Sequence, residues 1–145
     1  MYIEKINEPT VELHLALQRL IPQLGVHKAS PDPTELAALL NSAGSTLLIA
    51  RDPDENGEII GMLSLTLYRV PTGMRSIIED VVVDEGRRNR GAGEALVRHA
   101  IGLAREAGAN GVSLTSNPQR EAANRLYQSI GFELRKTNAY FYKLK

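Results

Sequence analysis

Near the start of the chain, apolar residues recur at helical spacing in two separate segments. Residues 10–21 carry apolar side chains three and four positions apart, and Pro22 ends this run, so the pattern predicts a helix there. A second helix is expected from Asp32–Glu35 to about Asn41, because Asp caps helices, Pro suits the first turn and Glu suits the third position.

The middle of the chain changes to strand-like patterns separated by turn residues. Residues 45–51 form a short apolar run, residues 58–70 form a long one, and residues 74–84 end in consecutive valines. The turns between them contain Asn56-Gly57, a favoured hairpin pair, and Pro71-Thr72-Gly73. The three strands are therefore predicted to form an antiparallel meander.

Helix and strand patterns alternate in the remainder of the chain. Helices are predicted over residues 91–107 and 118–130, a short strand over 111–116, and one or two final strands over 132–144. The succession of strand, helix and strand from residue 76 to 116 is a βαβ unit with a right-handed crossover, so its two strands should be parallel. The expected fold class is α/β (an α+β mixed sheet) in a single domain, residues 1–145.

Composition narrows the class of protein. The chain has 145 residues, of which 43% are hydrophobic and 23% charged, which suits one folded domain and excludes a disordered chain. No apolar run is long enough to span a bilayer and no secretory signal is visible, so we expect a cytoplasmic protein without a membrane partner. With no cysteine and three scattered histidines, neither a metal site nor a cysteine nucleophile is expected.

The net charge of zero conceals an uneven distribution. Residues 1–86 contain six Lys and Arg against thirteen Asp and Glu, whereas residues 87–145 contain eleven against four. The basic half opens at Arg87-Arg88-Asn89-Arg90, which indicates a local site for an anionic ligand. A nucleic-acid partner is not expected, because only 5% of the residues are aromatic and no basic stripe extends beyond this turn.

The segment from Val81 to Gly93 joins a buried strand to a helix through a turn rich in arginine and glycine. The first amides of a helix lack partners within the helix, and the glycines let an anion approach the backbone closely. Arg88 and Arg90 add positive charge, so a pyrophosphate would fit this turn. The alternative is an ordinary helix start with solvated arginines. Neither the Gly-Lys-Ser/Thr pattern of phosphate-loop ATPases nor the dinucleotide-binding fingerprint is present.

Two motifs resemble those of one acetyltransferase family. Arg88-Asn89-Arg90-Gly91-Ala92-Gly93 matches the Arg/Gln-x-x-Gly-x-Gly/Ala loop of the GCN5-related N-acetyltransferases (GNAT). It lies where that family has this loop, between the family's fourth strand and third helix. Asn124-Arg125-Leu126-Tyr127, followed by Ile130-Gly131-Phe132, resembles the family's Asn-x-x-Tyr and Gly-Phe segment. The resemblance covers nearly the whole chain. It implies the GNAT-like acyl-CoA N-acyltransferase fold, with an antiparallel N-terminal meander and splayed parallel strands.

The resemblance also implies that acetyl-CoA binds as a co-substrate. The residues expected to cradle its pyrophosphate with their backbone amides are Arg88, Asn89, Arg90, Gly91, Ala92 and Gly93. The residues expected to border its pantetheine arm are Val81, Val82 and Val83. The backbone of Val83 in particular should pair with the pantetheine amides, because such peptide-like groups can extend a sheet edge. Asn124 is expected to hydrogen-bond the cofactor.

Transfer of an acetyl group to an amine needs a base for the amine and a proton for the leaving thiolate. Tyr127 is the candidate acid, because Arg120, Asn124 and Tyr127 share one face of the last predicted helix and the family match favours a donor there. Glu79 is the candidate base, since the family more often uses the carboxylate at this position. Strand alternation should send Glu79 and Asp80 to opposite faces. The alternatives are a tyrosine packed at the edge of the core and a carboxylate that is solvated or paired with arginine.

These features lead to one leading hypothesis and two alternatives. The leading hypothesis is an enzyme, an N-acetyltransferase (an acyltransferase) that moves an acetyl group from acetyl-CoA directly to the primary amine of a small-molecule acceptor, amino-sugar-like or amino-acid-like. A protein or peptide N-acetyltransferase and a non-catalytic acyl-CoA sensor are the alternatives. The family often dimerises, so a homodimer is left open.

Overall fold

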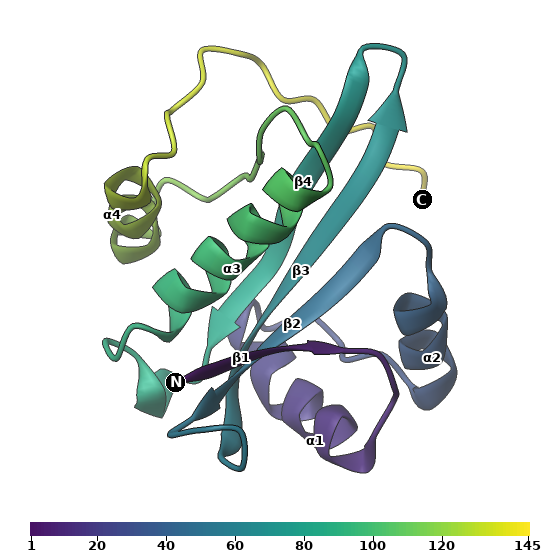
Figure 1. Ribbon diagram of the computed structural model, residues 1–145, viewed down its shortest axis with the longest axis vertical. Coiled ribbons are helices and arrows are strands. Elements are labelled where there is room, and N and C mark those ends of the chain that lie inside the picture. Colours follow the sequence, from purple (N-terminus) through teal and green to yellow (C-terminus); the bar gives the residue numbers. More distant parts are fainter. The chain divides into compact units, whose positions relative to one another are not determined.

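Four antiparallel strands form the sheet of the protein, in the order β1-β2-β3-β4 (Figure 1). The computed structural model describes residues 1–145, which divide into two units, Met1–Thr115 and Ser116–Lys145. The elements of the first unit are β1 (Tyr2–Ile6), α1 (Val11–Leu20), the 3-10 helix η1 (Ile21–Gln23), α2 (Pro33–Asn41), β2 (Ser45–Asp52), β3 (Glu58–Val70), β4 (Gly73–Val83), the 3-10 helix η2 (Glu85–Arg87) and α3 (Ala92–Glu106). The second unit contains one helix, α4 (Glu121–Ile130). No helix of the structure could span a lipid bilayer.

The predicted meander of three strands is confirmed, and the structure adds β1 beside it. The strands β2, β3 and β4 all end within one residue of their predicted bounds. β1 pairs with β2, from Tyr2 opposite Arg51 to Ile6 opposite Leu47. The hydrophobic pattern does not predict β1, because its five residues are few and include two charges. Since β1 closes one side of the sheet, β4 forms the opposite edge.

The helices of the first unit cover both faces of the sheet (Figure 1). Leu47 and Ile49 of β2 belong to the core cluster that contains the buried residues of α1 and α2. Leu48 and Ala50 point to the other face, where α3 contacts all four strands, and both are fully buried. Leu96 of α3 is fully buried as well. The sheet therefore separates two apolar layers.

The two helices on the first face begin at side-chain caps. At the start of α1, the hydroxyl of Thr10 accepts the N–H of Leu13 at 3.1 Å. At the start of α2, Asp32 accepts the N–H of Glu35 at 2.8 Å, and the Glu35 carboxylate accepts the N–H of Asp32 at 3.1 Å. The predicted start of α2 is thus confirmed and takes the form of a capping box. Each cap stabilises its helix by about 0.5–2 kcal/mol.

β4 contains a bulge at Asp80. Glu79 pairs with Ser64 and Val82 pairs with Met62, so two residues of β4 stand opposite the single residue between them on β3. Asp80 has a φ of 52°, in the left-handed region that few residues other than glycine enter and that Asp tolerates. The bulge interrupts the alternation on which the predicted orientations of Glu79 and Asp80 depend.

The strand predicted over residues 111–116 is reduced to one parallel bridge, between Ile77 and Ser113. The N–H of Ile78 donates to the carbonyl of Ser113 at 2.8 Å, and the N–H of Ser113 donates to the carbonyl of Ser76 at 3.0 Å. The parallel direction of the predicted βαβ unit is thereby confirmed, although the pairing stops after Ser113. Beyond Ile78, β4 therefore has no backbone ladder on its outer side.

The second unit keeps the predicted helix but not the predicted strands. α4 begins at Glu121 rather than at residue 118, because the side-chain oxygen of Asn117 accepts the N–H of Gln119 at 2.9 Å and holds the chain in a turn. Gly131 ends the helix with a φ of 125°, as predicted. Residues 132–144, predicted as strands, take no regular secondary structure. Strand-like residues alone are insufficient there, because a strand also needs a partner for its backbone groups.

One arginine joins three elements of the first unit. Arg51 on β2 donates from Nε to Glu4 on β1 at 2.9 Å, and from both terminal nitrogens to Glu12 on α1 at 2.8 Å. Arg51 also donates to the carbonyl of Gly57 at 3.0 Å. The two-pronged contact is the geometry in which arginine binds a carboxylate best. This hydrogen bonding from Arg51 holds the pKa of Glu12 below its usual value of 4.5.

Replacing Glu12→Gln should lower the free energy of unfolding by about 0.5–1 kcal/mol at neutral pH, because the side chain of Glu12 is 54% exposed. Since folding lowers the pKa of Glu12, its stabilising contribution is present above pH 4.5 and is lost as the pH falls through the folded-state value. Urea denaturation of both proteins between about pH 3 and about pH 8 measures this loss. Glu55→Gln, at an exposed glutamate, is the control. A difference that persists undiminished in acid contradicts the role of the ion pair.

Candidate functional site

The backbone amides at the start of α3 have no hydrogen-bond partners within the protein. The N–H of Arg87 donates to the carbonyl of Asp84, and the next amide with a partner is that of Ala95, which donates to the carbonyl of Gly91. The N–H groups of residues 88–94 are unpaired, and no side chain caps the helix. Unpaired amides at the positive end of a helix dipole form a site for an anion.

Two residues with left-handed backbone shape this turn. Asn89 has a φ of 66° and Gly91 has a φ of 88°. Gly91 precedes the right-handed residues of α3, and such a left-handed residue beside right-handed ones aims successive amides into one concavity, which is a common form of anion site. A Cβ on Gly91 would meet no atom within 4 Å, so the backbone angle requires this glycine and packing does not.

Two arginines of the turn reach toward the hairpin between β2 and β3. Arg87 contacts the carboxylates of Glu58 at 2.9 Å and Asp52 at 3.4 Å, so its charge is used within the protein. The Nη1 of Arg90 lies 3.6 Å from a carboxylate oxygen of Asp52, and the side chain of Arg90 is 57% exposed. Arg90 is therefore better placed than Arg87 to meet an anion from solution.

The three valines that end β4 lie at its free edge. The N–H of Asp84 donates to a carbonyl of β3 at 2.7 Å. Because backbone groups alternate along an antiparallel strand, those of Val82 point toward β3, and those of Val81 and Val83 point to the free side. On that side the carbonyl of Val83 accepts the Nε of Arg88 at 3.0 Å. The backbone of Val81 and the N–H of Val83 remain for an extended ligand.

The helix α1 is tied to the residue that follows β4. Arg19 donates from Nε to one carboxylate oxygen of Asp84 at 3.0 Å, and Gln23 donates to the other at 3.3 Å. The side-chain oxygen of Gln23 accepts the N–H of Glu85 at 2.9 Å, and Arg19 also donates to the carbonyl of Ile59 on β3. Together, α1 and η1 position the start of the turn that carries the unpaired amides.

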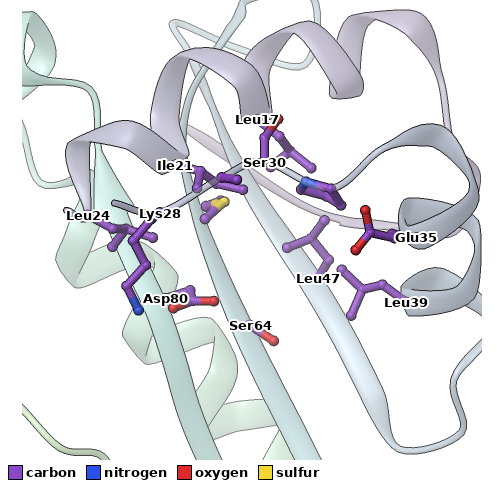
Figure 2. A pocket seen from close by; sticks show the side chains of 13 residues that line it. Leu17, Ile21, Leu24, Lys28, Ser30, Glu35, Leu39, Leu47, Ser64 and Asp80 are labelled. Carbon is purple, nitrogen blue, oxygen red and sulfur yellow. The ribbon is translucent and has the colours of Figure 1, made fainter. Parts of the chain in front are cut away.

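A cavity of about 310 Å³ opens between α1, α2 and the strands β2, β3 and β4 (Figure 2). Its volume lies at the low end of the range of small-molecule sites, about 300–1,000 Å³. The lining residues are Leu17, Ile21, Leu24, Lys28, Ala29, Ser30, Pro31, Glu35, Leu39, Leu47, Met62, Ser64 and Asp80. The lining is mostly apolar, with charged groups only on Lys28, Glu35 and Asp80.

Asp80 lines this cavity, whereas Glu79 is not among the lining residues. Glu79 is nevertheless the cross-strand partner of Ser64, which does line the cavity, and directly paired residues share a face. Both carboxylates therefore lie on the cavity side, and the prediction that they point to opposite faces is wrong. The bulge is the physical reason, because its extra residue interrupts the alternation of side chains.

In the second unit, α4 carries Asn124 and Tyr127. The side-chain amide of Asn124, predicted to meet the cofactor, donates to the carbonyl of Asn117 at 3.1 Å. Tyr127 packs edge-to-face against Phe132, with ring centroids 5.9 Å apart. Burial raises the pKa of the Tyr127 hydroxyl above its usual value of 10, and the nearby Arg120 offsets part of this rise. The hydroxyl is therefore protonated at neutral pH.

Sequence patterns miss three features of this region. Lys28 lies in the connection between α1 and α2, where no periodicity marks a lining residue. The orientation of Asp80 follows from a bulge, and the adjacent charges Glu79-Asp80 before three valines are the only sequence signal for it. The contact between Arg19 and Asp84 joins positions 65 apart, which no local pattern reveals.

Replacing Gly91→Ala should lower the free energy of unfolding by about 1–2 kcal/mol, because a Cβ disfavours the left-handed backbone by that amount. Gly86→Ala in the same turn is the matched control, since a Cβ there also meets open space but the backbone is not left-handed. The control should change the stability by no more than about 0.5 kcal/mol. Guanidinium denaturation compares the two variants, and equal effects contradict the role given to the backbone angle of Gly91.

Comparisons with known sequences point to one family. The model described as the acetyltransferase (GNAT) family matches residues 13–132. YhfO, an uncharacterized N-acetyltransferase of Bacillus subtilis (strain 168), is 34% identical over 100 residues. The match covers 68% of this chain and 65% of YhfO, so it spans less than two thirds of that relative.

Solved structures resemble the protein over almost its full length. A putative acetyltransferase from Agrobacterium tumefaciens str. C58 has a TM-score of 0.84 and 27% sequence identity, covering 99% of this chain and 100% of its own. An aminoglycoside acetyltransferase from an uncultured soil metagenomic sample, in complex with trehalose, has a TM-score of 0.85 and 21% identity, covering 99% and 96%. These likenesses confirm the predicted fold class. With the family match over residues 13–132, they establish that the chain belongs to the GNAT acetyltransferase family.

Proposed function

We propose that the protein is an acetyl-CoA-dependent N-acetyltransferase that acts on the primary amine of a small-molecule acceptor. The observation that carries this proposal is the run of unpaired amides over residues 88–94, on a motif of the GNAT family. A diphosphate brings two adjacent negative charges and several acceptor oxygens, which suits such a run of donors better than a single carboxylate does.

The residues around this turn fit the parts of coenzyme A. The amides proposed to hold the diphosphate are those of Arg88, Asn89, Arg90, Gly91, Ala92 and Gly93. The pantetheine arm, which carries peptide-like amides, would lie along Val81, Val82 and Val83 and pair with the free backbone groups of Val81 and Val83. Asn124 is proposed to contribute one further hydrogen bond to the cofactor.

The proposed chemistry is direct transfer. The nitrogen of the acceptor amine attacks the carbonyl carbon of the thioester, the C–N bond forms, and the C–S bond breaks with its electron pair remaining on sulfur. Glu79 takes the proton that the amine releases, and Tyr127 donates its hydroxyl proton to the thiolate. The raised pKa of Tyr127 supports this role, because it keeps the donor protonated. With no cysteine in the chain, an acyl-cysteine intermediate is excluded.

The cavity beside β4 is the proposed acceptor site. Its volume of about 310 Å³ favours a small molecule over an extended peptide. Asp80 brings a carboxylate into this cavity next to the strand that would hold the thioester. A sensor that binds acetyl-CoA without catalysis is the alternative, and the presence of both Glu79 and Tyr127 argues against it.

Coenzyme A should bind to the protein, and Arg90→Gln should weaken that binding about three- to tenfold, because an exposed charge contributes modestly to holding a phosphate. Arg98→Gln is the matched control, since the Arg98 side chain on α3 is also 57% exposed and pairs with Glu94. Isothermal titration calorimetry at low salt measures both variants. No heat on titrating coenzyme A contradicts the proposed function, and equal affinities of the two variants remove Arg90 from the site.

Replacing Tyr127→Phe should lower kcat about 10²- to 10⁴-fold and leave the affinity for coenzyme A within about threefold, because only the proton donor is lost. Since the pKa of Tyr127 is raised above 10, ionisation of this group should reduce the wild-type rate only above that pH. A thiol-release assay over a range of pH measures both effects. Tyr140→Phe, at an exposed tyrosine of the same unit, is the control. An unchanged kcat for Tyr127→Phe excludes it as the acid.

A further inference from the structure

Two opposite charges share one end of the cavity. Figure 2 shows the side chain of Lys28 extending toward Asp80, with Ser64 beside them on β3. No ion pair within 4.0 Å involves Lys28 or Asp80, and neither side chain makes a hydrogen bond within the protein. The two side chains come from different elements. Lys28 belongs to the connection between α1 and α2, and Asp80 belongs to the bulge of β4. Both charges are therefore available to a ligand.

The third charged group of the cavity, the carboxylate of Glu35, already accepts a hydrogen bond within the protein. Glu35 lies away from Lys28 and Asp80, near Leu39 and Leu47 (Figure 2). One of its carboxylate oxygens accepts the N–H of Asp32 in the cap of α2. Among the residues that line the cavity, the charges offered to a ligand are consequently one cation and one anion at the same end.

The rest of the cavity is built for an apolar group. Leu17 of α1, Leu39 of α2, Leu47 of β2 and Met62 of β3 line it from four elements. Leu17, Leu47 and Met62 also belong to the buried core cluster, so they form a fixed wall. The only uncharged polar side chains in the lining are Ser30 and Ser64. A ligand with many hydroxyl groups would lose hydrogen bonds to water there without gaining equivalents.

We infer that the acceptor is an α-amino acid with an apolar side chain, an inference that rests on the proposed function. In such a molecule the amine and the carboxylate leave the same carbon, which matches a carboxylate and an ammonium at one end of a cavity. The amine lies at Asp80, the carboxylate lies at Lys28, and the side chain packs against Leu17, Leu39 and Met62.

Other classes of amine fit this pattern less well. An amino sugar presents hydroxyl groups to the leucine wall, and a polyamine brings a second cation toward Lys28. A simple alkylamine fills the apolar part and meets Asp80, but it leaves Lys28 without a partner. The carboxylate is thus the group that separates the inferred class from an alkylamine of the same shape.

The reaction inferred for this acceptor balances without a further reagent. The α-ammonium held at Asp80 first loses one proton to the solvent. The uncharged α-amine then attacks the thioester carbonyl, the C–N bond forms and the C–S bond breaks. The proton released by the amine passes to the base, and the thiolate receives one proton from the acid. The products are coenzyme A and an N-acetyl amino acid, which retains the carboxylate for Lys28 but no longer carries an ammonium for Asp80.

A thiol-release assay with paired probes tests the inference. L-Methionine is compared with 3-(methylsulfanyl)propylamine, and L-leucine with isopentylamine, because the members of each pair differ only in the carboxylate. D-Glucosamine is the sugar probe. For the wild-type protein, kcat/KM should be at least about tenfold higher for each amino acid than for its amine, the size of one charge-assisted hydrogen bond.

The amines of each pair also differ in basicity, which by itself changes kcat/KM. Variants of Lys28 separate this effect from the preference for a carboxylate. Lys28→Met should lower the ratio of kcat/KM within each pair about tenfold, and Lys28→Glu should lower it further, because like charges repel. Lys5→Met, at an exposed lysine of β1 outside the cavity, should leave the ratio unchanged. Lys28 is exposed on a connecting segment, so these substitutions leave the core intact.

The outcomes distinguish the inference from the proposed function. If the alkylamines or D-glucosamine are turned over as fast as the amino acids or faster, the inference is overturned, and the proposed N-acetyltransferase activity stands. The inference is also overturned if coenzyme A binds but neither amino acid is acetylated, or if Lys28→Met leaves the ratio unchanged. Failure of the proposed function gives a different result: the protein binds no coenzyme A and releases no thiol with any probe.

Discussion

The unpaired amides at the start of α3 are the feature on which the proposed function rests most directly. The helices α1 and α2 have side-chain caps, whereas α3 has none, so the first amides of α3 keep their donors free. Gly91 begins α3 in a left-handed conformation, and contacts from Arg19 and Gln23 to Asp84 hold the turn from the other side. The fold thus presents an organised set of donors that an anionic ligand can complete.

The bulge of β4 places the two proposed ligand sites side by side along one strand. Before the bulge, β4 pairs on both sides, with β3 and with Ser113. At the bulge, Asp80 turns into the cavity beside α1 and α2. After the bulge, the side chain of Val82 belongs to the core cluster, and regular alternation is expected to turn the backbone groups of Val81 to the free edge. Asp80, on the side of the proposed acceptor, is therefore followed directly in the chain by Val81, where the edge proposed for pantetheine begins.

Features with a local cause could be predicted from the sequence. The cap at Asp32, the bounds of β3 and the arginine- and glycine-rich turn all depend on residues a few positions apart. Features set by distant partners could not. β1 becomes a strand by pairing with β2, residues 132–144 carry strand-like residues without forming a strand, and the orientation of Asp80 depends on its register with β3. The pattern of residues sets the elements, whereas long-range pairing decides which side chains reach the site.

Amide hydrogen exchange, followed by NMR with and without coenzyme A, tests the central claim most directly. If the unpaired amides hold the diphosphate, exchange at residues 88–94 should slow strongly on addition of coenzyme A, since each N–H gains an acceptor. The capped start of α2, where the N–H groups of Glu35 and Leu36 donate to Asp32, serves as the internal reference and should not change. Unaltered exchange at residues 88–94 in a sample saturated with coenzyme A contradicts the account.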